Sequence, residues 1–170
     1  FCQFTKNNYG VGVNSGTDAI KIALMAAGIK RNDEIITVSN TAVPTVSAIV
    51  ECGAKPIFVD VNENDYLINT SLIERKISKK TRVIMPVNLY GQSADYSAIN
   101  KIAKKHNLKV IEDCAQSAGS FYKRKPSGSS GDLAAFSFYP TKILGAYGDG
   151  GMVVTNNKNY FIRAKKLRKY

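Results

Sequence analysis

Short, continuous apolar runs alternate along this chain with segments whose apolar residues recur at helical spacing. A short continuous apolar run is typical of a strand that is buried on both faces, and the helical spacing indicates one buried face of a helix. Predicted strands cover residues 11–14, 34–39, 56–61, 82–91 (with an exit loop), 109–114, 133–139 and 151–155. Predicted helices cover residues 19–28, 40–52, 71–77 and 95–106. Strands and helices therefore alternate over most of the chain.

This alternation predicts an α/β fold of three layers, α/β/α, around a mainly parallel, mixed sheet. The mixed character comes from the last two predicted strands, residues 133–139 and 151–155. The segment between them is short and rich in glycine, which disfavours the helical crossover that parallel neighbours require. We therefore expect these two strands to run antiparallel, with Lys142 on the loop that joins them at the edge of the sheet.

Two helix starts can be predicted from their side chains. Residues 15–18, Ser-Gly-Thr-Asp, form a turn between the first strand and the first helix. The free N–H groups and hydroxyls of such a turn can bind an anion such as a phosphate, or they can simply cap the helix, and both readings stay open. Ser71 and Glu74 have the spacing of a capping box, which predicts that the helix over 71–77 begins there.

Sheets of this kind bind ligands beyond the carboxyl ends of their strands. Polar residues gather there at positions 15–17, 39–41, 88–92, 113–116 and 137–142. Asp113 ends a buried strand, and a buried carboxylate needs a cationic or hydrogen-bonding partner. A lysine that is desolvated in such a place becomes a nucleophile towards carbonyl groups. The alternatives are a purely structural aspartate and an exposed loop lysine.

Three chemical groups are expected at this edge of the sheet: the amine of Lys142, the carboxylate of Asp113, and a phosphate site formed by residues 15–17 and Ser137. They match the three groups by which pyridoxal 5'-phosphate (PLP) can be held, namely its aldehyde, its ring nitrogen and its phosphate. The sequence therefore predicts PLP as a cofactor.

Composition excludes several other classes of function. The 170 residues include 24 lysines and arginines against 13 aspartates and glutamates, a net charge of +11, but the basic residues are scattered and favour a solvated surface over nucleic-acid binding. Cys2, Cys52 and Cys114 fit neither a disulfide framework nor a metal site, so we expect a reducing, cytoplasmic setting. His106, the one histidine, is predicted on the surface, and no zinc site is expected. No apolar window approaches the length of a membrane span.

The chain resembles the DegT/DnrJ/EryC1/StrS sugar aminotransferase family, within the fold type I PLP enzymes. The similarity covers nearly the whole chain, and its most specific parts are VIEDCAQ (residues 110–116) and FSFYPTK (residues 136–142) followed by GDGG. It implies the large domain of an aspartate-aminotransferase-like fold. Residues 1–170 would form this PLP-binding large domain, and a small C-terminal domain would be absent from the sequence given. The sequence lacks an initiator Met and stops in a basic helical run, so a fragment is expected.

The resemblance implies a role for each residue around the cofactor ring. Lys142 would hold PLP as a Schiff base and then carry the proton during catalysis. Asp113 would pair with the pyridine nitrogen and keep it protonated. Gln116 would lie beside the ring, near its hydroxyl group.

The resemblance also implies a phosphate site and a substrate side. Gly16, Thr17 and Ser137 would bind the phosphate, and Tyr90 would line the sugar side of the pocket. Ala42 departs from the pattern, because many members place an aromatic residue there to stack on the ring. The active site would lie at the interface of a homodimer, whose second subunit helps to hold the phosphate.

The activity implied by the resemblance is transamination of a nucleotide-linked keto-sugar, with an amino acid, expected to be glutamate, as the donor. One alternative is a PLP-dependent sugar dehydratase of the same family, in some of which histidine replaces the lysine, so that the retained Lys142 favours transamination. Another is a non-catalytic regulatory relative. A cysteine desulfurase would need a histidine near the ring, where His106 is not expected.

Overall fold

The computed structural model describes residues 1–169, and Tyr170 lies outside them. Seven strands form one sheet in the order β1-β9-β8-β5-β4-β2-β3. They are β1 (Tyr9–Val13), β2 (Glu34–Val38), β3 (Lys55–Val59), β4 (Thr81–Ile84), β5 (Lys109–Asp113), β8 (Leu133–Ser137) and β9 (Gly151–Thr155). Within this sheet β9 runs antiparallel to its neighbours β1 and β8, and the pairs β8–β5, β5–β4, β4–β2 and β2–β3 are parallel. The mainly parallel, mixed sheet is confirmed.

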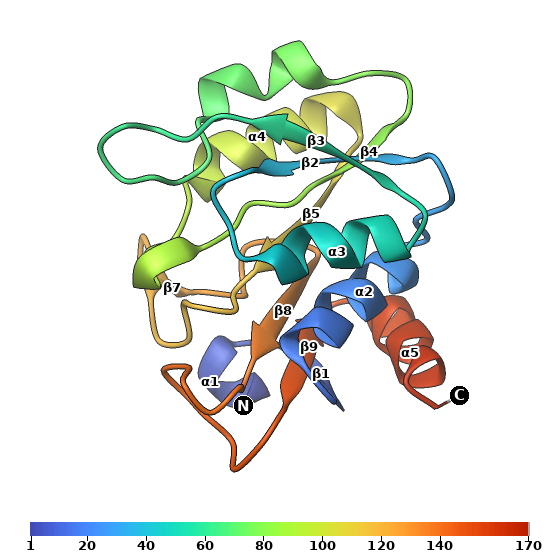
Figure 1. Ribbon diagram of the computed structural model, residues 1–170, viewed down its shortest axis with the longest axis vertical. Helices are drawn as coiled ribbons and strands as arrows, with labels where there is room; N and C mark the ends of the chain where they lie inside the picture. The colour runs from blue at the N-terminus through green and yellow to red at the C-terminus, as the bar shows by residue number, and fades with distance from the viewer. Residues whose placement is uncertain (170) are drawn as a thin grey trace.

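The strands β8 and β9 form the predicted antiparallel pair, in which Ala134 lies opposite Val154 and Ser137 opposite Gly151. The loop between them carries Lys142 and extends from one end of the sheet (Figure 1). Phe138 anchors this loop, because its N–H donates to Gly150 O over 2.8 Å and its carbonyl accepts the N–H of Ala146 over 2.8 Å. The anchored loop keeps Lys142 close to the carboxyl end of β8.

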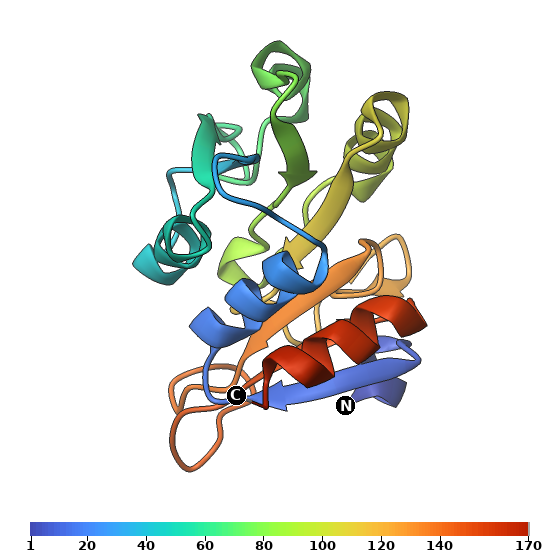
Figure 2. The ribbon, with the colours of Figure 1, turned by 90° about the vertical axis from the view of Figure 1, so that its right-hand side faces the viewer.

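Helices cover both faces of the sheet. The helices are α1 (Cys2–Thr5), α2 (Gly16–Ala26), α3 (Val43–Glu51), α4 (Tyr96–His106) and α5 (Lys158–Leu167). Successive strand residues alternate between two cores: Ile35 and Val83 pack in the core beneath α2, α3 and α5, whereas Ile36 and Ile84 pack in the core beneath α4. Figure 1 shows α2 between α3 and α5, and Figure 2 shows α5 beside β1. This alternation of buried side chains produces the three layers.

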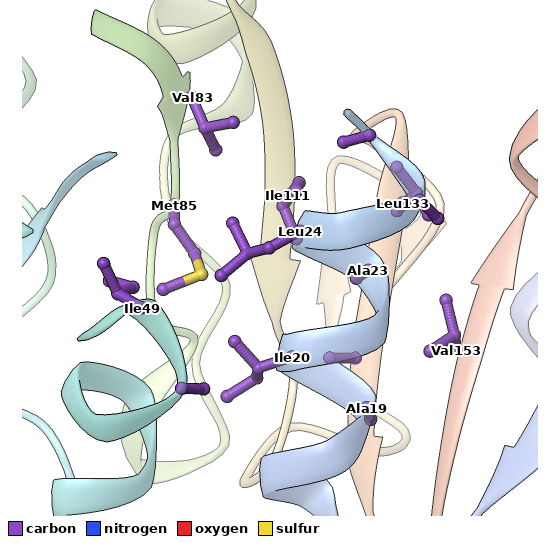
Figure 3. Packing of buried hydrophobic residues seen from close by; sticks show 14 of the residues in the cluster. Ala19, Ile20, Ala23, Leu24, Ile49, Val83, Met85, Ile111, Leu133 and Val153 are labelled. Carbon is purple, nitrogen blue, oxygen red and sulfur yellow. The ribbon is translucent and has the colours of Figure 1, made fainter. Parts of the chain in front are cut away.

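Helix α2 is the central helix of its layer, and its sequence explains both its place and its bounds. Its apolar residues Ile20 and Leu24 are one helical turn apart and almost completely buried. Figure 3 shows both side chains on the same side of the helix, with Leu24 beside Met85. The helix begins at a capping serine, Ser15, and ends just before Gly28, whose φ of +85° suits a residue without a side chain.

The predicted capping box at Ser71 and Glu74 is wrong. The segment forms two short 3-10 helices, η1 (Thr70–Leu72) and η2 (Glu74–Lys76), and Asn69 caps the first by accepting the N–H of Ser71 over 3.1 Å. Glu74 instead faces α4, where its carboxylate lies 2.7 Å from Lys105 Nζ and 2.8 Å from His106 Nε2. Glu74 therefore forms ion pairs with a helix distant in sequence and does not take part in a local cap.

Two further elements lie in segments to which the sequence assigned no regular structure. The turn region over residues 119–131 contains a small hairpin of β6 (Phe121–Tyr122) and β7 (Lys125–Pro126). The first turn, α1, packs Phe1 edge-on against Phe136 of β8, with ring centroids 4.8 Å apart. Phe1 and Cys2 pack on the core around Phe136, whereas Tyr122 of the hairpin packs on the core beneath α4.

Glu112 of β5 is a completely buried carboxylate that organises the loop before β8. Its oxygens accept the backbone N–H groups of Gly128 over 2.9 Å, Ser130 over 2.6 Å and Gly131 over 2.7 Å. Burial raises the pKa of Glu112, and these three N–H groups oppose the shift. The contact ties the end of the 119–131 region to the strand that carries Asp113.

Two searches of residues 1–169 gave negative results. None of their helices combines the length and the apolar character that crossing a membrane requires. These residues also contain no group of three or more His, Cys, Asp or Glu side chains that could hold a metal ion.

Replacing Glu112 by alanine is predicted to loosen the loop over residues 128–131, because three N–H groups lose their acceptor. An unsatisfied buried donor costs about 1–3 kcal/mol, so stability should fall by at least that amount. Hydrogen–deuterium exchange of the full-length protein, followed by mass spectrometry, measures the loop directly. The exposed Glu63 gives a matched control as Glu63→Ala. Unchanged exchange in the loop of Glu112→Ala would show that this contact does not hold it.

Candidate active site

A cavity of about 400 Å³ lies at the carboxyl ends of the central strands. Strands β5 and β8, the first turns of α2 and α3, and the loop between β8 and β9 all contribute to it. The cavity is lined by Ser15, Gly16, Thr17, Ile20, Thr41, Ala42, Pro44, Thr45, Val87, Leu89, Asp113, Ala115, Gln116, Ser137, Tyr139, Lys142, Asp149 and Gly150. Of the residues predicted for the site, Gly16, Thr17, Asp113, Gln116, Ser137 and Lys142 line this one cavity, and Tyr90 does not.

One corner of the cavity is formed by the N-terminus of α2 and the end of β8. Ser15 caps the helix, and its hydroxyl accepts the N–H of Asp18 over 3.1 Å. Capping is thus present, and the hydroxyls of Thr17 and Ser137 also line this corner. A Cβ atom on Gly16 would lie only 2.6 Å from Ser137 Cβ, so glycine allows this close approach. A helix N-terminus with hydroxyls beside it suits an anionic group.

Asp113 occupies the last position of β5 and is 2% exposed. Its Oδ2 accepts the hydroxyl of Thr45 over 2.7 Å, and its Oδ1 accepts the N–H of Ala115 over 3.1 Å. Burial raises the pKa of Asp113, while the hydrogen bond from Thr45, the N–H of Ala115 and the nearby charge of Lys142 lower it. A cationic N–H group bound at this carboxylate would further favour its ionised form.

Lys142 reaches the cavity from the loop between β8 and β9, and it is partly buried. Its backbone N–H donates to Tyr139 O over 2.8 Å, which closes a tight turn directly after β8. Lys142 therefore lines the same cavity as Asp113, although it lies on a loop and Asp113 at the end of a strand. Asp149, on the far side of the same loop, also lines the cavity.

Gln116 and Tyr90 meet at the rim of the cavity. The backbone N–H of Tyr90 donates to Oε1 of Gln116 over 3.3 Å, and the Tyr90 side chain is 60% exposed. Tyr90 has a φ of +58°, in the left-handed region that residues with a side chain rarely adopt. Such backbone strain is found most often at functional sites, and here it fixes an exposed aromatic ring beside a cavity residue.

Apolar side chains form the walls between these polar groups. The walls comprise Ile20, Ala42, Pro44, Val87, Leu89 and Ala115. A cavity with mostly apolar walls and a few convergent polar groups is the usual form of a small-molecule site. Ala42 contributes only a methyl group to the walls, so an aromatic stacking partner from this position is absent.

The sequence did not single out two of the polar residues that line the cavity, Thr45 and Asp149. Thr45 lies in a helical segment, 68 positions before the aspartate that it contacts. Asp149 belongs to the motif GDGG, which was noted as part of the family resemblance without a role for its aspartate. Spacing alone gives no signal for these residues, because only the folded loop and helix bring them to the cavity.

Comparison with known proteins identifies the relationship. A sequence model described as the DegT/DnrJ/EryC1/StrS aminotransferase family matches residues 1–170. The chain belongs to this family. The resemblance stated from the motifs is thereby confirmed.

The names of two curated relatives indicate the functions assigned to similar proteins. The chain is 52% identical over 160 residues to the dTDP-3-amino-3,4,6-trideoxy-alpha-D-glucose transaminase of Micromonospora megalomicea, covering 94% of the chain and 43% of the relative. It is 46% identical to a pleiotropic regulatory protein of Geobacillus stearothermophilus, covering 97% of the chain and 44% of the relative. The chain thus spans less than half the length of the curated relatives that it matches.

Solved structures of family members have the same fold. DesV of S. venezuelae, in complex with a ketimine intermediate, aligns with a TM-score of 0.97 at 40% identity, over 99% of this chain and 46% of that one. NtdA of Bacillus subtilis, with bound cofactor PMP, aligns with a TM-score of 0.90 at 35% identity, over 96% of this chain and 37% of that one. The predicted three-layer α/β/α fold of PLP aminotransferases is confirmed.

Replacing Gly16 by alanine is predicted to weaken anion binding at the corner between α2 and β8. The new Cβ would push Ser137 away from the helix, and losing one charge-assisted hydrogen bond reduces affinity about tenfold. A phosphorus NMR titration of the full-length protein with inorganic phosphate measures this. Gly12→Ala is the matched control, because a Cβ at Gly12 meets no atom within 4 Å. Equal phosphate affinity in the two variants would argue against an anion site here.

Proposed function

We propose that the protein containing this chain is a PLP-dependent aminotransferase that transfers the amino group of an amino acid, glutamate, to a nucleotide-linked keto-sugar. The single observation that carries the proposal is one cavity in which the Lys142 amine, the Asp113 carboxylate and the anion corner at Gly16 all converge. The names of the transaminase relatives and of the solved family members support it.

The residues of the cavity fit PLP group by group. The corner at Gly16, Thr17 and Ser137 would hold the phosphate, since it combines a helix N-terminus with two hydroxyls. The buried Asp113 would pair with the protonated ring nitrogen, a cationic N–H of the kind that this carboxylate needs. Gln116, at the rim, would lie beside the ring hydroxyl. When bound, PLP supplies an electron sink that stabilises negative charge on the substrate carbon.

Lys142 would have two tasks in this site. Its amine would bind the aldehyde of the cofactor in the resting enzyme. In each half-reaction the released amine would move a proton between the substrate carbon and the cofactor carbon. It would act first as a general base and then as a general acid. The backbone hydrogen bond from Lys142 N–H to Tyr139 O holds the main chain at Lys142 just after the end of β8. Tyr90 would contact the sugar from the rim.

We propose that residues 1–170 are the PLP-binding large domain of a longer protein that forms a homodimer. Apolar side chains around the Lys142 loop support the second subunit: Val43 is 77% exposed, Ile143 68% and Leu144 50%. Exposed apolar groups gathered beside a site are typical of an interface. The three cysteines are free thiols, which supports a reducing, cytoplasmic setting.

A second candidate function is regulatory, and the relative named as a pleiotropic regulatory protein is the observation that favours it. A sugar dehydratase of the same family is the third. Both Lys142 and Asp113 are present and line the cavity, which favours transamination over a protein that has lost its chemistry. Product analysis with glutamate and a nucleotide keto-sugar separates the three functions. A transaminase would form an amino sugar, a dehydratase would form a deoxygenated sugar, and a regulatory protein would form no product.

The half-reactions give the first test of the proposed function. The full-length protein with PLP should show the absorbance of bound cofactor, which should change on adding glutamate and return on adding a nucleotide-linked keto-sugar. No change with any of several amino acids, despite bound PLP, would contradict transamination.

Lys142→Ala is predicted to abolish turnover, because the variant lacks the group that transfers the proton. General acid–base groups contribute about 10²–10⁴-fold to the rate, and the covalent role adds to that loss. Steady-state assays of amino-sugar formation measure it. The exposed Lys79, which lies outside the cavity, gives the control variant Lys79→Ala. Activity of Lys142→Ala within a few-fold of the control would remove Lys142 from the mechanism.

A further inference from the structure

The Asp113 carboxylate is held by a threonine that comes from another layer of the fold. Thr45 lies in the first turn of α3, is 2% exposed, and directs its hydroxyl at Asp113 Oδ2 over 2.7 Å. The other oxygen accepts the N–H of Ala115 over 3.1 Å. The two contacts together fix the rotation of the carboxyl group.

A second threonine determines the direction of the hydrogen bond from the first. Thr41 Oγ1 lies 2.7 Å from Thr45 Oγ1, and either atom could donate. A hydroxyl has one proton, and an ionised carboxylate can only accept. With Asp113 ionised, the Thr45 proton is committed to Oδ2, so Thr41 must donate to Thr45. The chain therefore runs in one direction, from Thr41 through Thr45 to Asp113.

We propose that Thr45 is a positioning residue that keeps the Asp113 carboxylate ionised and turned towards the cavity, and that Thr41 orients the Thr45 proton for this task. The proposal rests on the proposed function, in which Asp113 binds the ring nitrogen of PLP. Hydrogen bonds in a row strengthen one another, and a buried carboxylate depends on them more than an exposed one does.

Protonation of Asp113 on Oδ2 would allow the chain to reverse. The carboxylic acid could then donate to Thr45 and Thr45 to Thr41, which would release the Thr41 proton from Thr45. The protonation state of Asp113 and the donor character of Thr41 are thus linked. The other titratable groups lining the cavity are Tyr139, Lys142 and Asp149, and Cys114 follows Asp113 on the buried side.

The test is the affinity of the full-length protein for pyridoxamine 5'-phosphate, measured by calorimetry. This probe has no aldehyde, so it reports the non-covalent contacts without the bond to Lys142. Thr45→Val has nearly the same shape but no donor, and it should bind about tenfold to a hundredfold more weakly, the range for a hydrogen bond to a charged group. Thr45→Ser, which keeps the hydroxyl, should restore most of the affinity.

Two further variants should rank in their affinity for pyridoxamine 5'-phosphate. Thr41→Val should lose less affinity than Thr45→Val, because it leaves the direct donor to Asp113 in place. Thr37→Val is the matched control: Thr37 is also completely buried, but its hydroxyl donates to Met85 O over 2.9 Å, away from Asp113. It should bind like the wild type.

A probe analogue whose ring nitrogen is replaced by C–H distinguishes positioning from a structural role. The affinity of this analogue should be the same for Thr45→Val as for the wild type, since the analogue cannot use the Asp113 carboxylate.

A second readout is the pH dependence of binding. Asp113 must be ionised to bind the ring nitrogen, so affinity for pyridoxamine 5'-phosphate falls as the pH drops through the pKa of Asp113. That fall should move to higher pH in Thr45→Val, because a donor to the charged form is lost.

The outcomes separate the two proposals. A wild type that binds neither PLP nor pyridoxamine 5'-phosphate would overturn the proposed function. A wild type that binds, together with a Thr45→Val variant of equal affinity, would overturn the role of Thr45 alone. Equal losses for both probes would also overturn it, by showing a structural effect. If Thr45→Val does not fold, the affinities of Thr45→Ala for the same two probes are measured instead, and they are interpreted in the same way.

Discussion

The burial of a carboxylate at the end of β5 is the constraint on which the rest of the site depends. Removing an ionised group from water is costly unless hydrogen bonds and opposite charge replace the lost solvation. At Asp113 those replacements come from three separate elements: the hydroxyl of Thr45 on α3, the N–H of Ala115 after β5, and the charge of Lys142 from the loop after β8. The carboxylate is therefore stable only when sheet, helix and loop are all in place.

The reversal of one strand explains how the lysine reaches this carboxylate. In a parallel sheet, the chain leaving the carboxyl end of a strand must cross over and return from the opposite end. Because β9 turns back antiparallel to β8, the chain stays at the carboxyl edge for the length of a loop. Lys142 lies on that loop, opposite the N-terminus of α2. The glycines make the approach possible: a Cβ on Gly151 would lie 2.3 Å from Ser15 O.

Much of this arrangement could be predicted from the sequence, because it depends on local patterns. Continuous apolar runs predicted the strands, and the short glycine-rich segment predicted the antiparallel pair and the place of Lys142. The two helix starts considered from the sequence turned out differently: Ser15 caps α2 by accepting the N–H of Asp18, whereas Glu74 pairs with Lys105 and Asn69 caps the first 3-10 turn. Local spacing cannot weigh a cap against a tertiary ion pair.

The unpredicted part of the site consists of contacts between distant segments. Thr45 appeared in the sequence as an ordinary residue of an amphipathic helix, and its hydroxyl acquires a function only through Asp113. Tyr90 was predicted to line the sugar side of the pocket. The direction of its ring, however, depends on its left-handed backbone and on the rim that it forms with Gln116. Such features follow from how the elements pack, which periodicity does not encode.

The central claim is that Lys142 is the amine that binds the cofactor aldehyde beside Asp113. The most direct measurement treats the full-length protein with PLP, reduces it with borohydride so that a carbonyl bound to lysine becomes a stable secondary amine, and maps the modified peptide by mass spectrometry. The account predicts the modification on the peptide that carries Lys142, and its loss in Lys142→Ala. Modification of a different lysine at stoichiometric yield, or of none, would contradict it.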